Sequence, residues 1–167
     1  SLWGRGMGKI AFVFASQGAQ YAGMGKDLYD ASPAARAVFD LAGEDVKRLC
    51  FDGPADVLSR TVNAQPCLFA MDLACAEALN EAGVSAEGAA GFSLGEIPAL
   101  CYCGLLGLED ALALVRLRAE SMQRCANEHP GAMIAVLRLT AEQVQAVCGE
   151  LPGAYAVNFN APGQTVV

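Results

Sequence analysis

The chain has 167 residues, a length typical of one domain with a sizeable hydrophobic core. Hydrophobic residues make up 54% of the sequence and are spread along it, which favours helices packed on a buried sheet. The formal net charge of −7 argues against a nucleic-acid partner, because such proteins need a basic surface to neutralise phosphates. The most apolar segment, residues 67–79, contains Asp72 and Glu77 and is too short to span a membrane, so we predict no membrane partner.

The seven cysteines are an odd number and lie mostly within apolar helical runs. This usage predicts reduced, buried thiols and a cytoplasmic location. Cys101 and Cys103 form a C-x-C pair, but the sequence has no second such pair, and His129 is its only histidine. Because a structural zinc site needs four ligands, we predict no metal.

The hydrophobic pattern predicts an α/β fold. Residues 9–15, KIAFVFA, are typical of a strand buried on both faces. Ser32 followed by Pro33 is a typical helix start. The elements expected in this part of the chain are, in order, a strand at 9–15, helices at 33–41 and 66–82, a strand at 88–92, and helices at 94–103 and 108–126.

The final segment has a different pattern, β-α-β-β. A strand at 132–139 precedes a helix that opens with a capping box of Thr140 and Gln143, and strands follow at 155–159 and 165–167. This order is typical of half a split βαβ module, and because the chain ends within a strand pattern we expect it to be truncated at the C-terminus. The expected organisation is a leader or scar at 1–6, an incomplete α/β core at 7–130 and a partial second subdomain at 131–167.

Residues 91–95 form a G-x-S-x-G segment between a predicted strand and a predicted helix, which is the context of a nucleophile elbow. Glycines allow the sharp turn that exposes the hydroxyl of Ser93, and the next amide, on Leu94, can stabilise an oxyanion. The same pattern also occurs in ordinary glycine-rich turns. In this strand-to-helix context we interpret Ser93 as the nucleophile.

Two further features fit acyl transfer. Residues 16–20, SQGAQ, follow the first strand, where open α/β sheets place ligands, so a backbone amide there can complete an oxyanion hole; taken alone, the segment favours a plain turn. Arg118 lies 25 residues after Ser93, and a guanidinium can bind a carboxylate through two hydrogen bonds. By itself Arg118 is typical of a solvated surface residue. Arg116 is two positions away and cannot share its face.

Five segments occur in the order and approximate spacing of one known family: FVFASQGAQYAGMG, NAQPCLFAMDLA, GFSLGE, LVRLRAESMQ and NFNAPGQ. On these segments the chain, from about Met7 to Val167, resembles malonyl-CoA:acyl carrier protein transacylases, a family that also supplies acyltransferase domains to polyketide synthases. The resemblance implies a hydrolase-like α/β core with a parallel sheet and a small ferredoxin-like insert, of which the β-α-β-β segment would be a part.

The resemblance also implies a reaction and the residues that perform it. Ser93 would be the nucleophile, Gln17 and Leu94 would donate oxyanion amides, and Arg118 would hold the malonyl carboxylate. Malonyl-CoA would acylate the serine and coenzyme A would leave. The phosphopantetheine thiol of acyl carrier protein would then take the malonyl group, in fatty acid or polyketide synthesis. No bound cofactor is implied.

The chain departs from the family pattern at several positions. Phe92 replaces the usual histidine before the serine, Ala15-Ser16 replaces a Pro-Gly pair, and Ala119 replaces a glycine. The family's catalytic histidine lies downstream of the segment that matches NFNAPGQ, beyond Val167. We interpret His129 as a surface loop residue and expect the catalytic base to be absent from this chain.

Two alternative functions remain open from the residues. A serine hydrolase of the lipase or patatin kind shares the G-x-S-x-G segment, although a neutral acyl pocket has no need of the glutamine loop and Arg118. A non-catalytic binding fragment would keep an acyl or carrier-protein surface without chemistry, which the missing histidine allows.

Overall fold

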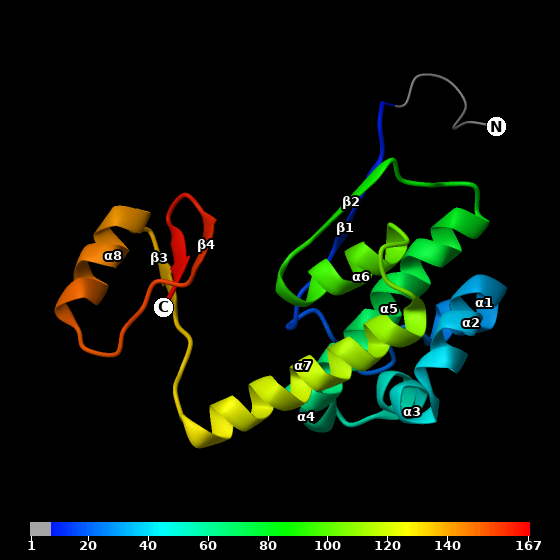
Figure 1. Ribbon diagram of the computed structural model, residues 1–167, viewed down its shortest axis with the longest axis horizontal. Coiled ribbons are helices and arrows are strands. Elements are labelled where there is room, and N and C mark those ends of the chain that lie inside the picture. Colours follow the sequence, from blue (N-terminus) through cyan, green and yellow to red (C-terminus); the bar gives the residue numbers. More distant parts are fainter. Residues whose placement is uncertain (1–7) are drawn as a thin grey trace. The chain divides into compact units, whose positions relative to one another are not determined.

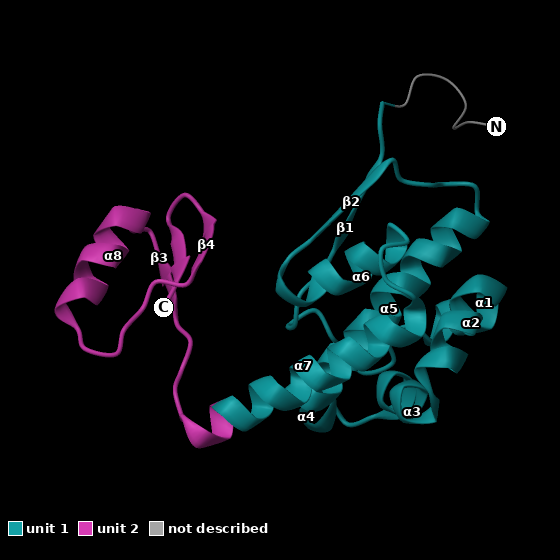
Figure 2. Ribbon diagram, viewed as in Figure 1, with its two compact units in different colours: residues 1–125 teal, residues 126–167 magenta. Residues whose placement is uncertain are grey.

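The computed structural model describes residues 8–167. The chain divides into two compact units, Ser1–Cys125 and Ala126–Val167 (Figures 1 and 2). The leader or scar expected at 1–6 lies outside the described residues. The division falls near the end of helix α7 (Leu108–Glu128), so residues 126–130 belong to the second unit rather than to the first.

The first unit contains more helices than the sequence pattern predicts. Helices α1, α3 and α4 were not predicted, because they are short and begin without a side-chain cap; α1 follows Gly25, which has a φ of 77°. The helices of this unit that precede α7 are α1 (Lys26–Ala31), α2 (Pro33–Ala42), α3 (Glu44–Asp52), α4 (Ala55–Leu58), α5 (Thr61–Glu81) and α6 (Glu96–Tyr102).

Helix α2 confirms the predicted start. The Ser32 hydroxyl accepts a hydrogen bond of 3.1 Å from the Ala35 N–H, and Pro33 occupies the first helical position, where no backbone donor is lost. The helix buries Val38 and Phe39 against the core, together with Ala35 and Ala42. The spacing of three and four residues between these side chains is that of one helix face.

Helix α5 lies at the centre of the first unit, where α1, α2, α3, α4 and α6 all contact it (Figure 1). The prediction at 66–82 was wrong about its start, because Pro66 lies inside the helix rather than at its first position. A proline inside a helix costs one hydrogen bond and crowds the preceding turn, but here the ring is buried in the core. Thr61 and Gln65 therefore belong to this helix.

The first unit has a two-stranded parallel sheet, which confirms the predicted strand direction. Strand β1 (Ala11–Phe14) pairs with β2 (Gly88–Gly91), with Ala11 opposite Gly88. The Phe12 and Phe14 rings pack against Tyr102 of α6, at centroid distances of 5.1 and 5.9 Å. The expectation that β1 is buried on both faces was wrong, because Val13 is 79% exposed. Successive side chains of a strand point to opposite faces, and only the face of Phe14 is buried.

The second unit is a three-stranded antiparallel sheet with one helix. The strands lie in the order β3-β5-β4, and the helix packs through Val144, which is buried. Thr140 and Gln143 form the predicted capping box, with both reciprocal hydrogen bonds present. The elements of this unit are β3 (Ala135–Leu137), α8 (Ala141–Glu150), β4 (Asn158–Ala161) and β5 (Gln164–Val166). The β-α-β-β order predicted from the sequence is confirmed.

The cysteines are free, but they are not all buried. Cys50 and Cys67 are buried in the core, whereas Cys103 and Cys125 are exposed, so the prediction of buried thiols was wrong for the latter two. Within residues 8–167, no helix combines the length and apolar character that crossing a membrane requires.

Gly95 joins the sheet to the following helix by close backbone contact. A Cβ atom at this position would lie 2.3 Å from the Phe14 carbonyl oxygen and 2.8 Å from that of Ala15. Real Cβ atoms do not approach backbone oxygens so closely, and neither carbonyl can move without disturbing β1. The segment after β2 can therefore pack on the end of β1 only because residue 95 lacks a side chain.

Gly95→Ala tests this contact. We expect the substitution to lower the free energy of unfolding by ~1–3 kcal/mol or more, because the new methyl group overlaps fixed backbone. Gly88→Ala is the matched control, since Gly88 begins β2, the strand that leads into this turn, and a Cβ there would meet no atom within 4 Å. Urea unfolding followed by circular dichroism measures both, and equal stability of the two variants would contradict the contact.

Candidate functional site

Ser93 lies at the sharp turn between β2 and α6, in the 3-10 turn η1 (Ser93–Gly95). Its φ is 53°, in the left-handed region that side chains rarely adopt, and among the described non-glycine residues only Arg138 shares this feature. The Gly95 N–H closes the turn with a 2.9 Å hydrogen bond to the Phe92 carbonyl. Ser93 is exposed while Leu94 is fully buried, so the turn presents the hydroxyl and anchors the residue after it.

Both glycines of the G-x-S-x-G segment are required by packing. A Cβ on Gly91 would lie 2.0 Å from the carbonyl carbon of Gly95, in addition to the clash that a Cβ on Gly95 would make with β1. The predicted placement of this segment between a strand and a helix is confirmed. The strained geometry is that of a nucleophile elbow.

Arg118 of α7 contacts the serine directly. Its Nη2 donates a 2.9 Å hydrogen bond to the Ser93 Oγ, and its Nη1 donates one of 2.7 Å to the Gln65 Oε1. Arg116 instead forms an ion pair with Asp45 at 2.9 Å, which agrees with the prediction that the two arginines occupy different faces. Hydrogen bonding to Arg116 also holds the pKa of the Asp45 carboxyl below its usual value.

Gln65 of α5 is the residue of this cluster that sequence reasoning missed. Its side chain is fully buried, and besides accepting from Arg118 it places its Nε2 3.4 Å from the Gln17 Oε1 and 3.3 Å from the Met122 sulfur. The available signal was an amide directly before the apolar run that begins at Pro66. That signal was lost because the helix was predicted to begin at Pro66, one residue later.

Gln17 lies in the loop that follows β1, and α5 holds its side chain at two points. Its Nε2 donates a 3.2 Å hydrogen bond to the Thr61 Oγ1, and its Oε1 faces Gln65. The structure therefore brings together all four site residues predicted from the sequence. Arg118 donates a hydrogen bond to Ser93, and both Arg118 and Gln17 contact the side chain of Gln65. Leu94 directly follows Ser93 in the chain.

Asp72 is a second polar group of α5 near this loop. Burial raises the pKa of its carboxyl to about 7, and the nearby Ala15 backbone N–H partly opposes the increase. Its Oδ2 atom is buried and has no hydrogen-bond partner among the described residues. In the sequence, Asp72 is one of two charges within the apolar segment 67–79, and nothing local distinguishes it as a site residue.

His129 is exposed in a bend of the second unit, which confirms that it is a surface loop residue. It is the only histidine in the 167 residues. Within residues 8–167, no cluster of three or more histidine, cysteine, aspartate or glutamate side chains is arranged to hold a metal ion.

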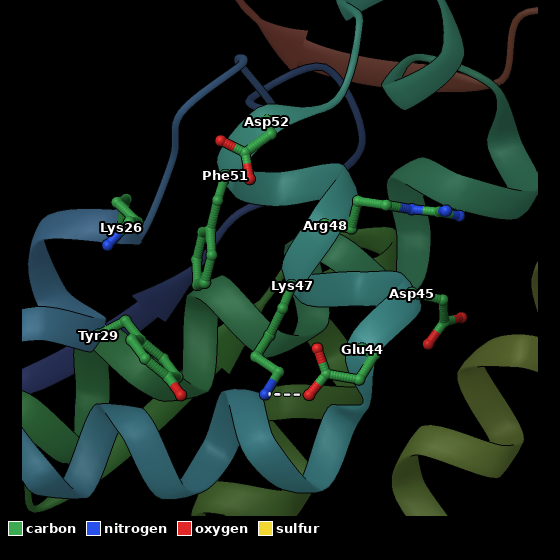
Figure 3. Close-up of a pocket in the computed structure, with 8 residues that line it drawn as sticks. All are labelled: Lys26, Tyr29, Glu44, Asp45, Lys47, Arg48, Phe51 and Asp52. Carbon is green, nitrogen blue, oxygen red and sulfur yellow. Dashed lines mark ion pairs between the residues drawn. The ribbon is translucent and has the colours of Figure 1, made fainter.

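An open cavity of ~620 Å³ lies between α1 and α3, and it contains none of the predicted site residues (Figure 3). Two carboxylates neutralise its Lys47, Asp40 at 2.8 Å and Glu44 at 2.6 Å, and these hydrogen bonds raise the pKa of the lysine. The cavity is lined by Lys26, Tyr29, Glu44, Asp45, Lys47, Arg48, Phe51 and Asp52. Because the basic and acidic side chains that line this cavity balance one another, it attracts an ionic ligand only weakly. The candidate site is therefore the cluster of Ser93, Arg118, Gln65 and Gln17.

Known proteins match this chain along nearly its whole length. The acyl transferase domain family matches residues 11–167. A malonyl CoA-acyl carrier protein transacylase of Bacillus subtilis is 44% identical over 133 residues, which are 77% of this chain and 42% of the relative. A crystal structure of the corresponding Clostridium perfringens transacylase has a TM-score of 0.85 at 38% identity, and covers 95% of this chain and 52% of its own.

A further solved structure is a malonyl-transacylase in complex with the acyl carrier protein of a type II polyketide synthase. It has a TM-score of 0.88 and 35% identity, with 95% of this chain and 54% of the other covered. The chain thus spans about half the length of each of these three relatives. A match of this extent, together with the α/β fold and its parallel sheet, shows that the chain belongs to the acyl transferase domain family.

Proposed function

We propose that the protein carrying this chain transfers a malonyl group from malonyl-CoA to the phosphopantetheine thiol of acyl carrier protein, through an ester on Ser93. The observation that carries the proposal is the position of Arg118, whose guanidinium lies 2.9 Å from the Ser93 oxygen and is fixed by the buried Gln65. The relatives named as malonyl transacylases support the same substrate.

The acyl selectivity follows from the length of a malonyl group. Its free carboxylate lies one methylene away from the carbonyl that Ser93 attacks, so it must lie beside the serine. A planar guanidinium anchored there can bind that carboxylate through two parallel hydrogen bonds. A hydrolase of neutral acyl esters would gain nothing from such a half-buried, pre-positioned cation, and the transferase is therefore the favoured function.

The chemistry assigns each remaining residue a role. The Ser93 oxygen attacks the thioester carbonyl, its proton passes to a base, and the bond to the sulfur of coenzyme A breaks. Backbone amides of Leu94 and Gln17 stabilise the negative charge on the carbonyl oxygen. By the resemblance, the base is the histidine that family members carry downstream of the segment matched here. Attack by the carrier-protein thiol then reverses the sequence and frees the serine.

We also propose that the second unit is part of a ferredoxin-like subdomain, on its β3-α8-β4-β5 order and antiparallel sheet. Acyl carrier protein is the proposed partner. A malonyl-transacylase of the same fold solved with a carrier protein supports this.

The nucleophile is tested by acylation. The chain is joined at Val167 to the part of the Bacillus subtilis relative that follows the matched segment, and the fusion is incubated with malonyl-CoA. We expect mass spectrometry to locate a malonyl ester on Ser93, and Ser93→Ala to abolish it. The unmodified relative serves as the positive control. Labelling that persists in the alanine variant would refute Ser93 as the nucleophile.

The role of Arg118 is tested by substrate choice. In the same fusion, we expect Arg118→Ala to reduce malonyl transfer by about 100-fold or more, the scale of 2.7 kcal/mol, because the carboxylate loses its charged partner. Acetyl transfer should change far less. Arg116→Ala is the matched control, since Arg116 pairs with Asp45 on another face. Equal losses of malonyl and acetyl transfer in Arg118→Ala would count against a carboxylate clamp.

A further inference from the structure

We propose that Thr61 is a positioning residue for the acyl transfer proposed above: together with Gln65 it holds the side chain of Gln17, and thereby places the Gln17 backbone N–H as an oxyanion donor. This inference rests on the proposed function, because it assigns Thr61 to the same site. Among the described residues, no hydrogen bond joins Thr61 to Ser93 or Arg118. Its hydroxyl acts through Gln17.

Helix α5 holds both ends of the Gln17 side-chain amide. The Gln17 Nε2 donates a 3.2 Å hydrogen bond to the Thr61 Oγ1, and the Gln17 Oε1 accepts one of 3.4 Å from the Gln65 Nε2. Thr61 and Gln65 are about one helical turn apart, so both side chains lie on one face of the helix. Gln65 cannot reverse its own amide, because its Oε1 accepts from Arg118. The Gln17 amide is therefore held in one orientation, since the reverse would place two amino groups against each other.

The loop that carries Gln17 has little packing to hold it. Gln17 and Gly18 are exposed, and a Cβ added to Gly18 would meet no atom within 4 Å. Gly18 has a φ of 117°, a conformation that favours glycine, so the backbone turns directly after Gln17. Because apolar contacts do not fix this turn, its hydrogen bonds determine where the Gln17 peptide lies.

A second contact orders the turn and occupies one of its amides. The Gly18 N–H donates a 2.8 Å hydrogen bond to the Gln20 Oε1, and the Gln20 Nε2 donates one of 3.5 Å to the Ser59 Oγ. The start of α5 thus supports the loop twice, through Thr61 and through the preceding Ser59. Among the described residues, no group accepts from the Gln17 backbone N–H. Of the amides of Gln17 and Gly18, that of Gln17 is therefore the one available to an oxyanion.

Displacement of an oxyanion donor affects the transition state rather than the binding of substrate. The thioester oxygen gains its negative charge only as Ser93 attacks, so a donor aimed at this oxygen lowers the barrier without tightening the binding of malonyl-CoA. Malonyl and acetyl thioesters develop the same charge. Loosening of Gln17 should therefore slow both transfers by the same factor, whereas loss of Arg118 should slow malonyl transfer far more.

The direct test compares Thr61→Val, which removes the hydroxyl but keeps the branched shape, with Thr61→Ser, which keeps the hydroxyl. Two-dimensional ¹H–¹⁵N NMR on the full chain follows the side-chain amide and the backbone N–H of Gln17. We expect Thr61→Val to shift the side-chain resonances toward those of a solvated amide and to shift the backbone resonances of Gln17 and Gly18, and Thr61→Ser to keep both near their wild-type positions. The side-chain amide of Gln143, whose Oε1 accepts from the Thr140 N–H in the second unit, is the internal reference and should not move.

The kinetic test uses the fusion protein. Thr61→Val should lower kcat for Ser93 acylation by roughly 3- to 10-fold, less than the loss of about 100-fold or more on removing an oxyanion donor outright, and KM for malonyl-CoA should stay unchanged. The ratio of malonyl to acetyl transfer should keep its wild-type value, and Thr61→Ser should restore kcat. A general loss of stability would not reproduce this combination.

The outcomes separate this inference from the proposed function. Gln17 resonances that do not move in Thr61→Val would overturn the role of Thr61, and so would a wild-type kcat in that variant or a loss confined to malonyl transfer. Failure of Thr61→Ser to restore kcat would also overturn it, because the hydroxyl would then not be the group that matters. Absence of any malonyl ester in the wild-type fusion would refute the transferase itself, even where the NMR shifts of Gln17 follow the hydroxyl.

Discussion

The candidate site depends on one buried side-chain amide, that of Gln65. Its carbonyl end accepts from Arg118 and its amino end faces Gln17, so one residue connects the cation with the loop after β1. A buried amide left without partners would cost about 1–3 kcal/mol, which is why the network holds its members in one arrangement. Helix α5 can supply this amide from the interior of the first unit because five other helices contact it.

The sequence was sufficient for the parts of the site whose signals are local. A G-x-S-x-G segment after an apolar strand predicts the elbow, and Ser32 with Pro33 predicts a helix start. Gln65 and Asp72 could not be predicted from the sequence, because nothing local distinguishes a polar residue that faces a site from one that interrupts an apolar run. Short helices such as α1 could not be predicted either, because tertiary packing rather than a side-chain cap stabilises them.

The elbow also shows how a strained residue is maintained. Ser93 has a φ of 53°, a conformation that costs on the order of 1–3 kcal/mol for a residue with a side chain. Gly95 allows a backbone contact with the end of β1, and Gly91 allows one with Gly95 itself, and no larger residue permits either contact. The buried side chain of Leu94 anchors the turn in the core. The cost at the serine is thus offset by the packing of the residues on either side of it.

The hydrogen bond between Arg118 and Ser93 has a consequence for timing. In the empty site the guanidinium occupies a lone pair of the serine oxygen, which makes that oxygen a poorer nucleophile. Under the proposed function, an arriving carboxylate would compete for the same guanidinium and would free this lone pair when the correct acyl group is in place. Under the proposed function, selectivity then lies in switching the nucleophile on as well as in binding. An acyl thioester that lacks a carboxylate would meet a serine oxygen that is still hydrogen-bonded to Arg118.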